Sequence, residues 1–255
     1  MTLDILQIPV LSDNYIYLLE DKESQACAVV DPALAGPVLE VLAARGLSLN
    51  YILNTHHHGD HVGGNQELKA KTGCAIVGPR AEARRIPGID LALGEGDVFT
   101  LGSLEAVVFD VPGHTSGHVA YWFESEAALF CGDTLFALGC GRLFEGTPDD
   151  MWTSLSSLRA LPGETRVYCA HEYTQQNARF ALSVDPENAA LVARAAAVDA
   201  LRAKGQPTVP STIAEERATN PFLRADKPDF CHALALDTAS PVQVFAETRR
   251  RKDSF

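Results

Sequence analysis

The segment Thr55-His56-His57-His58-Gly59-Asp60-His61 decides how the rest of this sequence is interpreted. It follows directly on the apolar stretch Tyr51 to Leu53, which predicts a strand that ends where the histidines begin. Residues two apart in an extended segment project to the same side, so His56 and His58 are expected to face one point. Asp60 and His61 can then turn towards a second point. Four metal-binding side chains within six residues are enough to serve two ions.

Three later segments repeat this design, in which an apolar strand ends in a potential metal ligand. These are Val107 to Val111 before His114, Ala128 to Cys131 before Asp133, and Val167 to Cys169 before His171. Proteins with alternating strands and helices gather their site residues at the carboxyl ends of neighbouring strands. We therefore expect one metal site built from His56, His58, Asp60, His61, His114, Asp133 and His171.

The chemistry of this set favours borderline cations. Five imidazoles and two carboxylates suit zinc first, and iron or manganese as alternatives, whereas a structural zinc site would need closely spaced cysteines. Seven ligands fit two divalent ions that share one carboxylate. Two such ions, about 3.5 to 4 Å apart, lower the pKa of a bound water and polarise a carbonyl group. The set therefore predicts a hydrolase.

The remaining histidines and two glycines are assigned to other roles. We expect His57 to point away from the metals, His118 to form hydrogen bonds beside the ligands, and His232 to be structural or solvated. Gly117 and Gly132 are expected to permit tight turns next to the ligands.

Composition narrows the class of protein. The 255 residues are 46% hydrophobic, which is enough for a sizeable core, and a net charge of -12 disfavours binding to nucleic acid. We expect no membrane partner and a cytoplasmic location, because neither a leader nor a run of about 18 apolar residues is evident, and we also expect a monomer. The six cysteines, without CxxC pairs, are expected to be reduced and buried. An anionic substrate would need the basic run from Arg249 to Lys252.

The sequence divides near residue 171. Strands are expected at Tyr15–Leu19, Cys27–Val30, Tyr51–Leu53, Ala106–Val111, Ala128–Cys131 and Arg166–Cys169, and helices between them at Pro37–Arg45 and Asn65–Lys71. Helical signals dominate after residue 172. There we predict helices from an N-cap at Asp185 to Lys204, from a capping box at Thr212 and Glu215, and from Ser240 and Pro241. We expect a body of strands and helices at 1–171 and a helical domain at 172–255.

The HxHxDH segment, followed at wide intervals by His114, Asp133 and His171, resembles the metallo-β-lactamase superfamily. The resemblance implies an α/β fold, a four-layer αββα sandwich with the metals at one edge of its two sheets. It also implies the ligand sets. His56, His58 and His114 would bind one ion, Asp60, His61 and His171 the second, and Asp133 would bridge them.

Further motifs resemble the glyoxalase II, or hydroxyacylglutathione hydrolase, family over nearly the whole chain. They are Ser12-Asp13-Asn14-Tyr15, Gly132-Asp133-Thr134-Leu135-Phe136, Gly139 to Thr147, Ala170 to Thr174, Thr219 to Arg224, and the closing Arg-Arg-Arg-Lys-Asp-Ser-Phe. The resemblance implies that a helical C-terminal domain binds substrate. By this similarity Arg142, Phe144, Tyr173, Arg249 and Lys252 would contact glutathione. Phe144 replaces a Tyr of some relatives, and Gly59 is smaller than the residue many relatives carry.

The implied reaction is hydrolysis of S-D-lactoylglutathione to D-lactate and glutathione, the second step of methylglyoxal detoxification. A metal-bridging hydroxide would attack the thioester, and Asp60 would be the catalytic residue that orients this hydroxide. The alternative within the same fold is a glutathione persulfide dioxygenase with a single iron, which the complete second ligand set disfavours. A non-catalytic binding protein of this fold is expected to lack a ligand, and all seven are present. The acidic balance disfavours a ribonuclease, and the motifs outside the metal segment point away from a β-lactamase.

Overall fold

The computed structural model describes residues 2–255, which form two compact units. The first unit extends to Asp110 and includes Ser116–Gly132, and the second comprises Val111–Thr115 and Asp133–Phe255. The chain therefore crosses between the units near His114 and again at Asp133, two of the predicted metal ligands.

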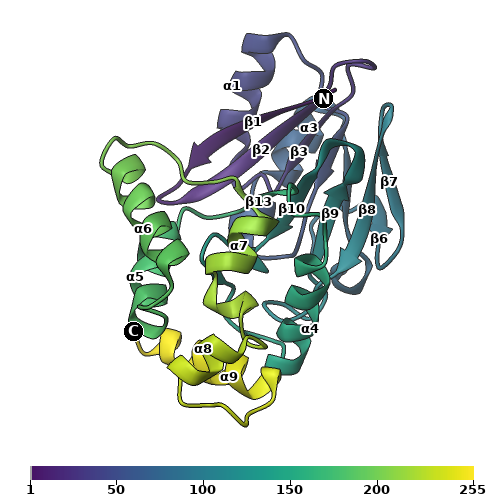
Figure 1. The fold of residues 1–255 in the computed structure, drawn as a ribbon. Coiled ribbons are helices and arrows are strands. Elements are labelled where there is room, and N and C mark those ends of the chain that lie inside the picture. Colours follow the sequence, from purple (N-terminus) through teal and green to yellow (C-terminus); the bar gives the residue numbers. More distant parts are fainter. Residues whose placement is uncertain (1) are drawn as a thin grey trace. The chain divides into compact units, whose positions relative to one another are not determined.

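One sheet of the first unit is mixed. Its strands lie in sequence order: β1 (Leu3–Val10), β2 (Asn14–Asp21), β3 (Cys27–Val30), β4 (Tyr51–Leu53), β5 (Ala75–Pro79) and β6 (Leu91–Leu93). The first three, labelled in Figure 1, pair antiparallel, and β3 to β6 pair parallel. Because β3 and β4 are parallel neighbours, the residues that follow them, from Asp31 and from Asn54, emerge at the same edge.

The helices of the first unit include two that bury an apolar side against this sheet. The helices of this unit are α1 (Ala35–Arg45), α2 (Gly59–Val62) and α3 (Asn65–Thr72), with 3₁₀ turns η1 (Arg80–Glu82) and η2 (Glu124–Glu126), and α1 and α3 are the two that pack on the sheet. Val38 and Leu42 of α1 and Leu68 of α3 join one core cluster with strand residues such as Ile52. The predicted helices at 37–45 and 65–71 are confirmed, and both end at a left-handed glycine, as expected.

An antiparallel group completes the first unit. In the order β7 (Val98–Leu101), β8 (Leu104–Asp110), β9 (Val119–Phe123) and β10 (Ala128–Gly132), each strand pairs with the next. The predicted strands at 106–111 and 128–131 are confirmed to within two residues. β1, β5, β6, β7 and β9 were not predicted.

The second unit is mainly helical. Its helices are α4 (Pro148–Arg159), α5 (Thr174–Val184), α6 (Ala189–Arg202), α7 (Ile213–Thr219), α8 (Pro228–Ala233) and α9 (Pro241–Asp253), with the 3₁₀ turn η3 (Pro221–Leu223). Short strands pair as β11 (Leu135–Phe136) with β12 (Gly139–Cys140), and β13 (Arg166–Cys169) with β14 (Ser211–Thr212). Figure 1 shows α5 and α6 side by side as a helical hairpin. Mixed sheets followed by a helical C-terminal region are the fold class that the resemblance implies.

Helix starts in this unit are partly as predicted. The predicted capping box at Thr212 forms with Glu215, and the helix predicted from Ser240 and Pro241 begins there, where Ser240 forms a capping box with Gln243 that was not predicted. The N-cap predicted at Asp185 is wrong. Asn188 caps α6, where its side chain accepts a hydrogen bond from the Leu191 amide, and Asp185 instead ends the unpredicted helix α5. The Asp185 carboxylate lies 3.3 Å from the Arg224 guanidinium, a tertiary partner that a local motif does not reveal.

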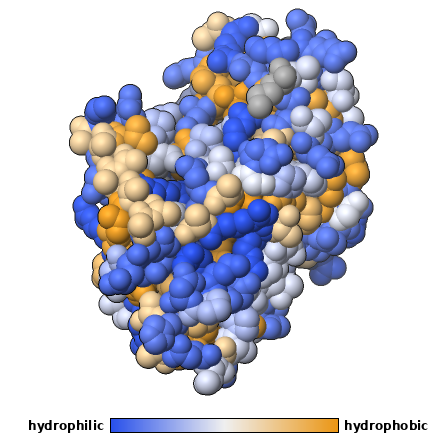
Figure 2. Space-filling model, in the orientation of Figure 1, coloured by the Kyte–Doolittle hydropathy of each residue, from blue (hydrophilic) through white to orange (hydrophobic). Residues whose placement is uncertain are grey.

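The surface of the molecule and its cysteine side chains have the features expected of a globular protein. Among residues 2–255 no helix is long and apolar enough to cross a membrane. On the face seen in Figure 2, hydrophilic residues dominate and apolar residues lie in small groups between them. All six cysteine side chains are buried as predicted, and burial raises the pKa of Cys27 and Cys169 to about 12.

Candidate metal centre

The first unit holds four of the predicted ligands on one short stretch. After β4, the chain passes through His56 and His58 and enters α2 at Gly59. His56 Nε2 lies 3.0 Å from His58 Nδ1, so these two imidazoles do face one point. His61 Nε2 lies 3.6 Å from Asp60 Oδ2, and the Asn14 amide donates to the same carboxylate oxygen at 2.9 Å.

A buried carboxylate sets the direction of these rings. Asp31, which follows β3, accepts hydrogen bonds from the Thr55 amide at 2.8 Å and from the Thr55 hydroxyl at 2.7 Å. It also lies 3.0 Å from His61 Nδ1. A carboxylate at this distance favours the tautomer with the proton on Nδ1, which leaves the lone pair of His61 on Nε2, on the side of Asp60.

The Thr55 hydroxyl orients a second ring in the same way. Since its proton is donated to Asp31, its oxygen accepts from His56 Nδ1 at 3.1 Å. The lone pair of His56 is then on Nε2, directed at His58. Two imidazoles that converge in this way suit a cation held by nitrogen ligands.

Other residues of the first unit also hold the loop from Thr55 to Gly59 in place. Glu82, 1% exposed, accepts from the His57 amide at 2.8 Å and from the Gly117 amide at 3.0 Å. His57 Nδ1 lies 2.7 Å from the same carboxylate, so His57 has a structural partner of its own. The ring of His118 stacks on that of His56 at 4.6 Å. Gly132 is left-handed, with φ of 48°, and a Cβ there would lie 2.3 Å from the Thr55 hydroxyl oxygen.

The second unit holds the other three predicted ligands around one carboxylate. His114 Nε2 is 3.3 Å from Asp133 Oδ2, and His171 Nε2 is 3.4 Å from Asp133 Oδ1. All three side chains are buried. A carboxylate that presents one oxygen to each of two imidazoles has the geometry required of a ligand shared between two ions.

The donor chemistry of these three residues fits divalent metal ions. His114 Nδ1 lies 2.9 Å from the Arg142 carbonyl oxygen, which can only accept, so Nδ1 carries the proton. The lone pair on Nε2 then faces a carboxylate oxygen. Two acceptors at this distance repel unless a cation or an extra proton lies between them. Imidazole nitrogen with carboxylate oxygen suits zinc, iron or manganese.

Residues predicted to bind substrate border this second set. The Tyr173 ring stacks on the His171 ring at 4.7 Å with an interplanar angle of 2°. The Phe144 ring lies 5.1 Å from the His114 ring, yet 62% of the residue is exposed, so it can meet a ligand. Arg142 contributes its carbonyl group to His114, and its side chain is exposed.

The basic run at the end of α9 separates into two pairs. Arg249 is 5% exposed, donates to the Cys140 carbonyl at 3.1 Å and pairs with Asp253. Lys252 lies over the Phe180 ring at 5.1 Å, and burial, together with the Arg249 charge, lowers its pKa to about 8. By contrast, the side chains of Arg250 and Arg251 both bond to Glu247, and these hydrogen bonds lower the pKa of Glu247 to about 2.

Two supporting carboxylates were missed in the sequence. Asp31 directly follows the apolar run Cys27 to Val30, so it shows the same strand-then-ligand pattern that singled out Asp133. That signal was available. Glu82 lies in a polar stretch between Arg80 and Arg84, where a buried carboxylate has no local signature.

Comparison with known proteins covers the whole chain. Residues 11–171 match the model of the metallo-beta-lactamase superfamily, and residues 172–255 match that of the hydroxyacylglutathione hydrolase C-terminus. A hydroxyacylglutathione hydrolase of Methylococcus capsulatus is 65% identical over 253 residues, 99% of each chain. One of Rhodospirillum rubrum is 59% identical over 254 residues, 100% of this chain and 99% of that one.

Solved structures share the fold. ETHE1 from Myxococcus xanthus aligns with a TM-score of 0.68 at 24% identity, over 99% of this chain and 100% of that one. The protein TTHA1623, solved in a di-iron-bound form, aligns with a TM-score of 0.62 at 26% identity, over 86% of this chain and 100% of that one.

Proposed function

Because the chain belongs to the hydroxyacylglutathione hydrolase family of the metallo-β-lactamase superfamily, we propose that it hydrolyses S-D-lactoylglutathione to D-lactate and glutathione. The observation that carries the proposal is the full-length similarity at 65% identity, joined to a complete set of seven potential ligands. We retain the predicted cytoplasmic monomer as part of the proposal.

The seven predicted ligands form one binuclear centre in this proposal. His56, His58 and His114 bind one ion, Asp60, His61 and His171 bind the other, and Asp133 binds both. Support comes from the ring directions set by Asp31 and Thr55, and from the one-oxygen-each geometry at Asp133. Zinc is the first choice of metal, and the di-iron form of TTHA1623 makes iron a real alternative. When bound, the two ions activate the attacking water and polarise the thioester carbonyl.

The residues of the chain then bind and orient the reactants. Asp60, whose carboxylate is held by the Asn14 amide, is the catalytic residue that orients the attacking water by accepting a hydrogen bond from it. The glutathione sulfur leaves as a thiolate, which is a good leaving group near neutral pH, so a dedicated acid is unnecessary.

The glutathione peptide needs positive charge, since it carries two carboxylates. Lys252 is the cation best placed to bind one, because its neighbours are aromatic rings and its ammonium has given up much of its hydration. Arg249 holds the backbone at Cys140 and adds to the positive potential there. Tyr173, Phe144 and Arg142 complete the proposed contacts on the side of His171 and His114.

The test is an assay of thioester loss with S-D-lactoylglutathione on protein whose metal content has been measured. We expect turnover with little activity on a β-lactam or on RNA. Oxygen uptake with glutathione persulfide would instead support the dioxygenase alternative. A metal-replete preparation that leaves the thioester intact at neutral pH would show that the proposed function is wrong.

A further inference from the structure

One hairpin of the second unit carries one of that unit's three predicted metal ligands and contacts the other two. We call residues 133–142, which contain β11 and β12, the ligand hairpin. Asp133 is its first residue, and its Phe136 ring packs edge-on against His171 at 5.9 Å. Its Arg142 carbonyl accepts the proton of His114 Nδ1. A shift of this hairpin therefore moves the surroundings of every ligand in the set.

The ligand hairpin is poorly equipped to hold its own shape. β11 and β12 are two residues each, and Phe136 pairs with Gly139 across a turn made by Ala137 and Leu138. Leu138 is left-handed, with φ of 58°, a conformation that is unfavourable for a residue with a Cβ. Something outside the hairpin must stabilise this turn.

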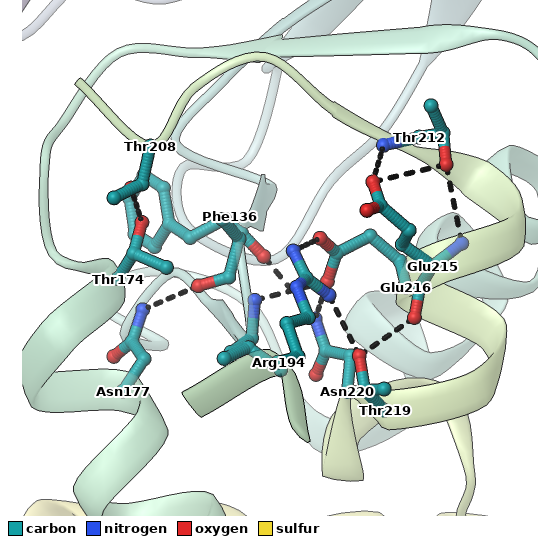
Figure 3. Close-up of polar contacts among 12 residues, drawn as sticks. Phe136, Thr174, Asn177, Arg194, Thr208, Thr212, Glu215, Glu216, Thr219 and Asn220 are labelled. Carbon is teal, nitrogen blue, oxygen red and sulfur yellow. Dashed lines mark hydrogen bonds and ion pairs between the residues drawn. The ribbon is translucent and has the colours of Figure 1, made fainter. Parts of the chain in front are cut away.

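Two fully buried side chains of the helical region bond to its backbone (Figure 3). The Asn220 amide nitrogen donates to the Phe136 carbonyl at 3.1 Å and to the Gly139 carbonyl at 3.0 Å. Its direction is fixed because the Asn220 oxygen accepts from the Phe222 amide. Glu216 accepts the Leu138 amide at 2.9 Å, and its other oxygen pairs with Arg194.

Other helices reach the remaining carbonyl groups. Asn177 of α5 donates to the Ala137 carbonyl at 3.1 Å, and Arg249 of α9 donates to the Cys140 carbonyl (Figure 3 shows Asn177). The Leu138 side chain packs in a core cluster with residues of α5 and α6, such as Ala178 and Leu191. Side chains from α5, α7, α9 and the residue after α7 thus bond to the backbone from 136 to 140.

We propose that Asn220, Glu216 and Asn177 are positioning residues of the metal centre. They act through the ligand hairpin, so the helical C-terminal region sets the ligand geometry in addition to its proposed role in substrate binding. The inference rests on the proposed function only for the substrate of its assay.

The chemistry of the contacts favours positioning over simple adhesion. Glu216 is 0% exposed, and burying a carboxylate with Arg194 costs desolvation that offsets much of their attraction. Apolar side chains would hold α7 against the hairpin at least as well. Hydrogen bonds to a carboxylate and to an amide fix direction, which apolar contacts do not. The polar contacts converge on the one turn that lies between Asp133 and Arg142.

The experiment compares Asn220→Ala and Asn177→Ala with the matched control Thr212→Ala in the full-length protein. Thr212 caps the N-terminus of α7 and pairs with Glu215, so its loss weakens the same helix without removing a contact to the ligand hairpin. Each protein is stripped with a chelator and titrated with zinc alone. We then measure hydrogen exchange at the Leu138 amide, the thermal midpoint of unfolding, and steady-state kinetics on S-D-lactoylglutathione.

We expect Asn220→Ala to weaken zinc binding by about 10- to 100-fold and to lower kcat by about 10-fold, with KM within about twofold of the parent. The Leu138 amide should exchange faster. Asn177→Ala should show the same pattern more weakly, and Thr212→Ala should lower only the thermal midpoint.

The proposal is overturned if both asparagine variants keep the zinc affinity and kcat of the parent although their thermal midpoints are as low as that of Thr212→Ala or lower. If Asn220→Ala does not fold, Asn177→Ala decides alone, because it removes one hydrogen bond from a different helix. A parent protein that binds zinc without hydrolysing the thioester defeats the proposed function only, since the zinc titration still tests the hairpin.

Discussion

The ligand sets of the two units are built in opposite ways. In the first unit the four ligands lie within His56 to His61, where Asp31 and Thr55 orient single rings and Glu82 holds the loop through His57. In the second unit three ligands come from distant segments, and the ligand hairpin orients them through its Arg142 carbonyl and its Phe136 ring. Consequently one substitution can loosen the first set, whereas the second set is reached mainly through the helices that hold its hairpin.

The largest effects are expected at the ligands themselves. Asp133→Ala removes the carboxylate that faces both His114 and His171, so metal content should fall from about two ions per chain to below one. His58→Ala should leave about one, because it belongs to a single proposed site. We expect kcat to fall more than about 100-fold in both. Elemental analysis with kinetics checks this, and full activity with one ion in Asp133→Ala would refute a shared ligand.

The next largest effect tests the dependence of the first set on one residue. Asp31→Asn keeps the shape but removes the negative charge 3.0 Å from His61 Nδ1, and it turns the acceptor of two Thr55 hydrogen bonds into a mixed donor and acceptor. Zinc affinity should fall by about 10- to 100-fold, the usual cost of losing a residue that orients a ligand. Zinc titration measures it. Unchanged affinity would mean that packing alone orients His61.

Substrate binding should distinguish the two pairs of C-terminal cations. Lys252→Ala removes a partly desolvated charge, so KM for the glutathione thioester should rise by about 10- to 100-fold with metal content intact. Arg249→Ala should raise KM too, and should also lower stability because Arg249 holds the Cys140 carbonyl. Arg250→Ala and Arg251→Ala, whose side chains bond to Glu247, are the matched controls. Equal, small changes in KM for all four would assign the run to helix stability.

A smaller effect is expected from pH. With a pKa of about 8, Lys252 is charged below pH 8 and neutral above it, so kcat/KM should decline as the pH rises through this value. The decline should level off at about 10-fold, because only one charge contact is lost. Lys252→Arg keeps its charge throughout and should remove the step. A step of the same size in Lys252→Arg would assign it to another group.

Several strands and helix starts in both units could be predicted from the sequence for physical reasons. Tyr51 to Leu53 and Arg166 to Cys169 are short apolar runs with a ligand-bearing loop after them, and both are strands with the expected bounds. The capping box of Thr212 with Glu215 and the helix start at Ser240 and Pro241 depend on neighbouring residues, so both could be predicted locally. The seven ligand assignments remain a prediction as one complete site.

What the sequence did not predict depends on distant partners. Helix α5 begins after Tyr173 without a side-chain cap, so its start has no local signal. Glu216 and Asn220 resemble surface residues in sequence, yet both are buried because their partners lie on the ligand hairpin. The division predicted between residues 171 and 172 stays a prediction, and the compact units divide at other positions, because residues 111–115 group with the C-terminal part of the chain.

The contacts of the ligand hairpin also bear on how the protein folds. Asp31 and Thr55, which orient the first set, are 24 residues apart, whereas Asn220 and Arg249 reach the hairpin across 84 and 109 residues. Contacts of long sequence separation form slowly, because loop closure must precede them. We expect a refolding chain to acquire zinc in two kinetic phases, with the slower one reporting closure of the helices over the hairpin. Stopped-flow refolding in the presence of a zinc indicator would show whether the second phase slows further in Asn220→Ala.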